Sequence, residues 1–140
     1  MKILLAADGS QYTKKALAFL MANNSLFATP NELHVLHVQP SLSAEVKRFA
    51  GRQEVADYQR EEAEKVLEPI RKFLANHPVS FRADWVEGLP SDEIVKASKE
   101  DGAHLIIMGT HGHGVLGRLL MGSVAQRVVS ECEVPVLLVK

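Results

Sequence analysis

An apolar run that leads directly into a cluster of glycines is the feature that most limits how this chain can fold. Residues 105–108 read Leu-Ile-Ile-Met, and five glycines follow within fourteen positions, at 109, 112, 114, 117 and 122. A short continuous apolar run is typical of a strand buried on both faces. Glycines let backbone N–H groups turn toward an anion, and the N-terminus of the next helix supplies further donors. The stretch therefore predicts a buried strand, an anion-binding loop and a helix start.

The rest of the chain alternates strands with helices. Apolar or alternating runs predict strands at residues 3–7, 32–38, 79–86, 104–108 and 134–139, with helical spacing between them. Such alternation means right-handed crossovers and a mostly parallel sheet with helices on both faces. We expect a single α/β domain over residues 1–140, in which the winding of the chain reverses once so that helices cover both faces of the sheet. Its Rossmann-like, five-stranded sheet has the order 3-2-1-4-5, with a ligand crevice between the ends of strands one and four.

The middle of the chain is less regular than its two ends. Residues 41–60 contain few repeating apolar positions and are interrupted by Gly51, so we interpret them as a loop or a mobile helical entry. From about Gln59 the apolar residues recur at helical spacing across Pro69, which predicts a kinked helix. Residues 79–86 alternate between apolar and polar side chains, which predicts a strand with one wet face near a sheet edge.

Composition excludes several classes of function. The formal net charge is −1, which gives no support for a nucleic-acid groove or for binding to an acidic membrane surface. Cys132 is the only cysteine, so no intramolecular disulfide can form and a reducing compartment is expected. No apolar run approaches the ~20 residues of a membrane span. We therefore expect a cytoplasmic protein that binds no nucleic acid and does not insert into membranes.

Two well-known glycine motifs fit the loop only in part. The P-loop pattern nearly matches at residues 117–122, but Ser123 occupies the position where that motif needs lysine. The pattern G-x-G-x-x-G matches at residues 112–117, but the dinucleotide fold also needs an acidic residue at the end of the next strand, where this sequence has Lys140. We reject the first motif and disfavour the second.

A third pattern, Gly109-x2-Gly112-x9-Gly122-Ser123, fits without adjustment. Together with the segment Ala7-Asp8-Gly9-Ser10 after the first strand and Gly88-x-Pro90 before the third helix, it closely resembles the nucleotide-binding branch of the universal stress protein family. The resemblance covers nearly the whole chain. It departs from the common family pattern at His104, where an aspartate is frequent, and this position lies away from the predicted crevice.

The resemblance implies binding of ATP, with or without magnesium, usually in a homodimer and often without robust turnover. It places Asp8 by the ribose and adenine, and Asp8 is also the one loop residue that could touch a metal. The base would be lined by Ala6 and Val38, and the sugar would lie by Met108 and Gly109. The phosphates would be surrounded by His111, Gly112, Gly122, Ser123 and Val124.

Several of these residues also have purely structural explanations. Asp8 could cap the first helix, for which Ser10 and Thr13 are the other candidates, instead of accepting hydrogen bonds from a ligand. Ser123 could cap its helix, which is expected to continue to about residue 130, and donate to a phosphate at the same time. We interpret His111-x-His113 as facing phosphate or solvent, because two ligands do not make a metal site. Arg118 is expected to be solvated.

The last strand predicts how two copies assemble. Val134–Val139 is apolar throughout, yet the topology places it at a sheet edge, where an uncovered strand invites pairing. We therefore expect a homodimer about a two-fold axis through this strand. The favoured function is an ATP-binding protein of stress response or regulation that acts through an unknown signalling partner and is not an enzyme. The alternatives are a slow ATPase and a scaffold that uses no nucleotide.

Overall fold

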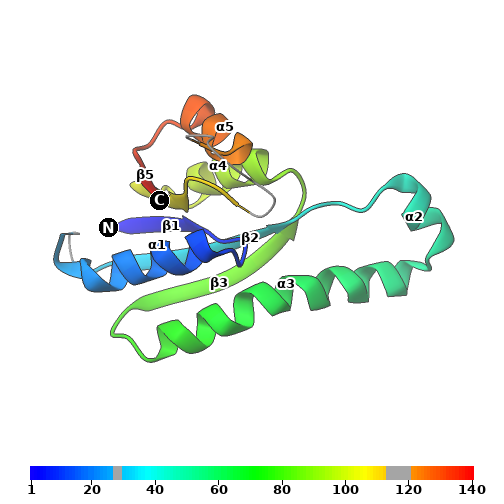
Figure 1. The fold of residues 1–140 in the computed structure, drawn as a ribbon, viewed down its shortest axis with the longest axis horizontal. Helices are drawn as coiled ribbons and strands as arrows, with labels where there is room; N and C mark the ends of the chain where they lie inside the picture. The colour runs from blue at the N-terminus through cyan, green and yellow to red at the C-terminus, as the bar shows by residue number, and fades with distance from the viewer. Residues whose placement is uncertain (27–29, 113–120) are drawn as a thin grey trace.

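The computed structural model describes residues 1–26, 30–112 and 121–140. It contains a five-stranded parallel sheet in the order β3-β2-β1-β4-β5, which confirms the predicted topology (Figure 1). The strands are β1 (Lys2–Ala6), β2 (Glu32–Gln39), β3 (Ser80–Glu87), β4 (Leu105–Gly109) and β5 (Val136–Val139). Leu5 in the central strand pairs with Val35 of β2 and Ile107 of β4, and all three side chains are fully buried.

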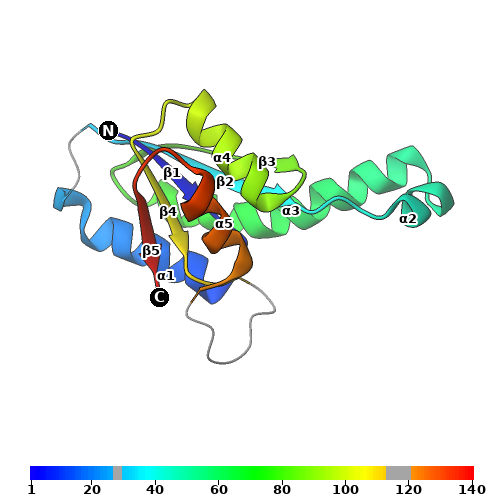
Figure 2. The ribbon, with the colours of Figure 1, turned by 90° about the horizontal axis from the view of Figure 1, so that it is seen from above.

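Helices cover both faces of the sheet, as expected for this topology. On one face α1 (Gln11–Ala22) and α3 (Arg52–Ala75) bury a cluster around Leu17, Leu67 and Ile70 against the strands. On the other face α4 (Pro90–Glu100) and α5 (Ser123–Glu131) bury a second cluster around Ile94 and Val128. Viewed from above, α4 and α5 lie over the strands (Figure 2). All four helices thereby anchor the loops at the carboxyl ends of the strands.

Within residues 41–60 the first three lack regular structure, and residues 44–60 are almost entirely helical. Of the two interpretations of this region, the helical one is therefore confirmed and the loop is wrong. The short helix α2 (Ala44–Phe49) and the first turns of α3 form an arm that extends beyond the sheet (Figure 1). Gly51 separates the two helices and is the N-cap of α3, which therefore begins seven residues before the predicted start at Gln59. No residue of α2 is buried, and Phe49 is 87% exposed. Helix α2 thus lacks the buried apolar face from which a helix can be predicted by the spacing of its apolar residues.

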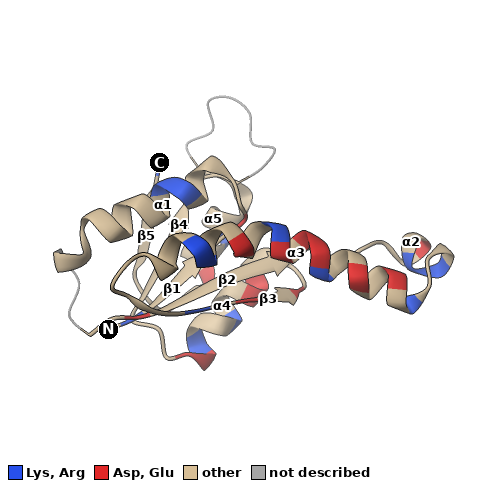
Figure 3. Cartoon of the chain, turned by 90° about the horizontal axis from the view of Figure 1, so that it is seen from below, with Lys and Arg blue, Asp and Glu red and all other residues tan. Residues whose placement is uncertain are grey.

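Helix α3 continues through Pro69 to Ala75, as the unbroken apolar phase predicted. A proline in a helix interior removes one hydrogen bond and costs roughly 3 kcal/mol. The helix tolerates this because its inner face buries residues on both sides of the proline, among them Leu67, Ile70 and Leu74. Charged side chains of both signs follow one another along its outer face (Figure 3).

Apart from the earlier start of α3, two helix caps can be compared with the sequence-based expectations, and a glycine follows the end of α4. The Ser10 side chain caps α1 by accepting a hydrogen bond from the backbone N–H of Tyr12. Gly102 follows the C-cap of α4 with a φ of 62°, the conformation expected of a terminating glycine. The prediction that Ser123 caps α5 was wrong, because Gly122 is the N-cap and Ser123 is the exposed first helical residue.

The two edge strands are β3 and β5, as predicted. All four residues of β5 are half-buried, although each is apolar. No helix among the described residues combines the length and apolar character needed to cross a membrane.

Candidate functional site

A cavity of about 450 Å³ lies at the carboxyl ends of β1, β2 and β4, next to the first turns of α4 and α5. We call it the carboxyl-end cavity. The structure brings all ten predicted site residues to its wall: Ala6, Asp8, Val38, Met108, Gly109, His111, Gly112, Gly122, Ser123 and Val124. The reversal of the strand order between β1 and β4 is the reason that segments so far apart in the sequence meet here.

Asp8 organises the turn between β1 and α1. Its Oδ1 accepts hydrogen bonds from the backbone N–H of Ser10 and from Oγ1 of Thr13, each at 2.9 Å. Its own N–H donates to Thr13 Oγ1 at 3.0 Å. Asp8 is therefore not the helix cap, which is Ser10, but it does bind the turn that the cap belongs to. The turn needs Gly9, whose φ is 79° and which lies against Val66 of α3.

Two glycines of the loop allow close approaches that a side chain would prevent. A Cβ atom at position 112 would collide with Oδ2 of Asp8, so the backbone at Gly112 lies directly against that carboxylate. A Cβ atom at position 109 would collide with Cβ of Tyr12 on α1. The turn after β1 and the glycine loop after β4 are therefore in contact at Asp8 and Gly112.

The last glycine lies on the cavity wall and also closes the loop. The N–H of Gly122 donates to the carbonyl of Thr110 at 2.6 Å, so this amide joins the two ends of the loop. The carbonyl of Gly122 accepts from Gln126 and begins the hydrogen bonding of α5. The N–H groups of residues 123–125 in the first turn have no partner in the described part of the chain, as is usual at a helix N-terminus. These amides, at the positive end of the helix dipole, are the donors that an anion would meet.

His111 is held in place from two sides. Its Nδ1 lies 2.9 Å from Oγ1 of Thr110, which is buried. Its ring contacts the ring of Tyr12, with 5.3 Å between the centroids. The imidazole is thereby fixed on the cavity wall. The predictions for His113 and Arg118, and the G-x-G-x-x-G match that includes Gly114 and Gly117, lie outside the described residues.

Part of the wall is apolar. The side chains of Leu36, Val38, Ile94 and Met108 belong to the buried cluster under α4 and α5, and they also line the cavity. Ala6 packs against the same cluster. A flat apolar group of a ligand can therefore lie between β2 and α4 without leaving a buried polar atom unpaired.

The sequence reasoning missed the wall formed by α3. Glu62 and Val66 line the cavity from this helix, one residue before the buried positions Ala63 and Leu67. The Glu62 carboxylate accepts a hydrogen bond from Lys65 Nζ at 2.7 Å, and this bond raises the pKa of Lys65. The helical spacing of the apolar residues placed Glu62 beside the inner face of α3, but only the packing of α3 across the sheet shows that this edge reaches the crevice.

The arm is attached to the sheet near the cavity. Gln59, 1% exposed, donates through Nε2 to the carbonyl of Pro40 at 2.9 Å, and Pro40 lines the cavity. Lys47 of α2 donates to Glu87 at the end of β3 at 3.1 Å. Hydrogen bonds from Lys47 and Ser41 lower the pKa of the Glu87 carboxyl below its ordinary value.

A second cavity, of about 460 Å³, lies at the opposite end of the sheet, and we call it the amino-end cavity. It is lined by the first residues of β1, β2 and β3 and by the C-terminal end of α4. Its central ionic groups bind one another. The His34 ring lies 2.5 Å from Asp101 Oδ2 and 2.8 Å from Asp84 Oδ1, and Arg82 donates to Asp101 Oδ1 at 2.5 Å.

The sequence of this chain is similar to those of known proteins along its whole length. The chain matches the model of the Universal stress protein family over residues 1–140. Universal stress protein MJ0531 of Methanocaldococcus jannaschii is 31% identical over 140 residues, which covers 99% of this chain and 81% of the relative. A universal stress protein of Thermus aquaticus is 36% identical over 143 residues, covering 99% of this chain and 97% of the relative.

Solved structures show the same fold. MJ0577 of Methanocaldococcus jannaschii superposes with a TM-score of 0.85 at 35% identity, covering 99% of this chain and 94% of that chain. Three universal stress proteins with AMP, cAMP and dAMP superpose with TM-scores of 0.71, 0.70 and 0.72 at 19%, 19% and 21% identity. Each covers 100% of this chain, and 91%, 97% and 98% of the respective structure is covered in return. The AMP complex is from Arabidopsis thaliana and the dAMP complex from Archaeoglobus fulgidus.

Proposed function

The chain belongs to the universal stress protein family, and from that premise we propose that it binds an adenine nucleotide, ATP in particular, in the carboxyl-end cavity. The observation that carries the proposal is the convergence of all ten predicted residues on one cavity wall. The complexes of similarly folded family members with AMP, cAMP and dAMP support the class of ligand.

In this proposal each part of the wall meets one part of the nucleotide. The base lies on the apolar side, against Ala6 and Val38, and the sugar lies by Met108 and Gly109. The phosphates lie at the N-terminus of α5, where the amides of residues 123–125 donate to them, with His111 and Gly112 alongside. In this assignment Gly122 closes the loop instead of donating to the ligand.

Magnesium fits this site as a companion of the phosphates. No three His, Cys, Asp or Glu side chains within the described ranges form a group suited to a metal. Magnesium commonly binds through one or two carboxylates together with substrate phosphates and water. Asp8 lies on the cavity wall and can supply one such oxygen.

We further propose that the protein acts as a homodimer in the cytoplasm, in stress response or regulation. The edge strand β5 is apolar and half-buried, so pairing with a second copy would cover its free backbone groups. A signalling partner would then respond to the nucleotide-bound state. Sedimentation at micromolar concentration should give the mass of a dimer, and a monomer mass would contradict this part of the proposal.

The most direct test is to identify what the freshly purified protein carries. Denaturation followed by mass spectrometry should release an adenine nucleotide, and calorimetry on the emptied protein should show ATP binding. If calorimetry detected no binding of ATP or AMP, the protein would instead be a scaffold that uses no nucleotide. Phosphate release above that of a Gly112 variant would favour the alternative of a slow ATPase.

A further inference from the structure

The carboxyl-end cavity has opposite electrostatic character at its two sides. The first turn of α5 presents amides at the positive end of a helix dipole. On the side of α1 and α3 lie Asp8 and Glu62, the only two carboxylates among the described lining residues. An anionic group is attracted to α5 and repelled from α3, whereas hydroxyl groups that donate hydrogen bonds are attracted to α3. A ligand with phosphate at one end and hydroxyl groups at the other therefore has one preferred orientation.

Asp8 is already committed to the protein. Its Oδ1 accepts hydrogen bonds from Ser10 in the β1–α1 turn and from Thr13 of α1, and the backbone at Gly112 lies against its Oδ2. A carboxylate has about four acceptor positions, so these contacts use much of its capacity. The hydroxyl groups of a ligand need a second acceptor nearby.

Glu62 has more acceptor capacity to spare than Asp8. Its side chain is 33% exposed on the cavity wall, and its one hydrogen-bond partner among the described residues is Lys65, whose side chain is 72% exposed. Such exposed pairs contribute between zero and about 1 kcal/mol, so a ligand can compete with Lys65 at little cost. Because α3 is anchored on both sides of this residue by Gln59 and Leu67, the carboxylate is presented from a rigid element.

We propose that Glu62 is a specificity-determining residue, which accepts hydrogen bonds from the 2′ and 3′ hydroxyl groups of the nucleotide's ribose. The inference rests on the proposed nucleotide-binding function and adds the residue that selects ribose over sugars without hydroxyl groups. Hydrogen bonds to a charged acceptor are stronger than neutral ones, so this contact is large enough to measure.

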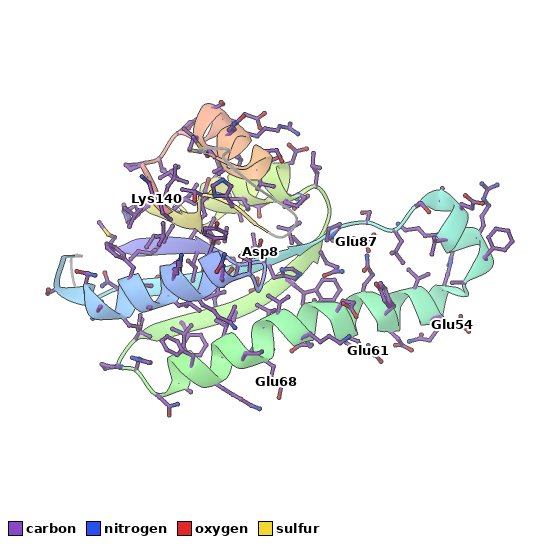
Figure 4. The ribbon with its side chains drawn as sticks, in the orientation of Figure 1. Asp8, Glu54, Glu61, Glu68, Glu87 and Lys140 are labelled. Atoms are coloured by element: carbon purple, nitrogen blue, oxygen red, sulfur yellow. The ribbon has the colours of Figure 1, made fainter. Side chains whose placement is uncertain are left out.

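The test compares AMP with 2′,3′-dideoxy-AMP by calorimetry in the wild type, Glu62→Met and Glu61→Met. Met has nearly the helix propensity of Glu and similar length, so both variants should keep the helix. Glu61 is the matched control because it is exposed and lies on the side of α3 that faces away from the sheet (Figure 4). Circular dichroism melting would establish that both variants are folded.

The wild type and Glu61→Met should bind AMP at least about tenfold more tightly than dideoxy-AMP, as expected for a charged hydrogen bond. Glu62→Met should weaken AMP alone and reduce this ratio to about threefold or less. An unchanged ratio in Glu62→Met would overturn the inference. Equal strengthening of both ligands would also overturn it, because Glu62 would then only repel phosphate. A wild type that binds AMP without preferring it to dideoxy-AMP refutes the Glu62 assignment alone, whereas a wild type that binds neither of them, nor ATP, refutes the proposed function.

Discussion

The two ends of the sheet carry cavities of almost the same volume, about 450 Å³ at the carboxyl end and about 460 Å³ at the amino end. They differ in what their polar groups do. At the amino end, the carboxylate of Asp101 lies 2.5 Å from both His34 and Arg82, so these ionic groups are satisfied by the protein. At the carboxyl end, the amides of the first turn of α5 have no partner in the described segments.

The difference between the two ends follows from the direction of the chain and not from cavity volume. In a parallel sheet every strand points its carboxyl end the same way, so the following helices all begin at that end. Helix N-termini leave N–H groups without partners, and those groups favour an anion. The amino end receives the C-terminus of α4, where the side chains of Arg82 and His34 complete the local network.

The largest expected effect comes from filling the carboxyl-end cavity. Gly112→Val would place Cβ against Asp8 Oδ2 and force the two loops apart. We expect nucleotide affinity to fall by about 100-fold or more, because donors must be held close to their productive positions. Calorimetry measures the loss. Gly51→Val is the control, since a Cβ at Gly51 meets no atom within 4 Å and its φ is −65°. Nucleotide binding by Gly112→Val at wild-type strength would show that the contact between the loops is not needed.

A substitution at the amino end should lower the stability of the protein and leave nucleotide binding nearly unchanged. His34→Leu removes both hydrogen bonds of the ring and leaves Asp101, which is mostly buried, with fewer partners. We expect the free energy of unfolding to fall by about 1–3 kcal/mol, measured by urea denaturation. Nucleotide affinity of the folded variant should stay within about twofold of the wild type. A large loss of affinity without loss of stability would mean that the two ends are not separate in function.

The smallest effect concerns the arm beside the carboxyl-end cavity. Because Lys47 lowers the pKa of Glu87 in the folded state, their pair stabilises the protein above the ordinary Glu pKa near 4.5 and loses this effect as the pH falls through the folded-state pKa. Both side chains are partly exposed, so the contribution is less than about 1 kcal/mol. Lys47→Met should therefore be slightly less stable than wild type at pH 7 and equal to it near pH 3. A difference that persisted or grew at low pH would contradict this origin.

The buried strands could be predicted from the sequence because burial on both faces leaves a continuous apolar run, as in β4 and its neighbour β1. The arm could not, since α2 buries no residue and so has no apolar period to detect. The cap of α5 depends on the long-range bond between Gly122 and Thr110, which no local pattern contains. Glu62 was missed for a similar reason, because its place on the wall follows from packing across the sheet.

The hydrogen bond between Thr110 and Gly122 has a consequence for how the chain tolerates changes in length between these two residues. It holds the end of β4 and the start of α5 together, whatever the length or sequence of the chain between them. Doubling the length of a closed loop costs only about 0.6 kcal/mol of entropy. Because this hydrogen bond joins residues outside positions 113–120, β4 and α5 can keep their places when the length of that segment changes.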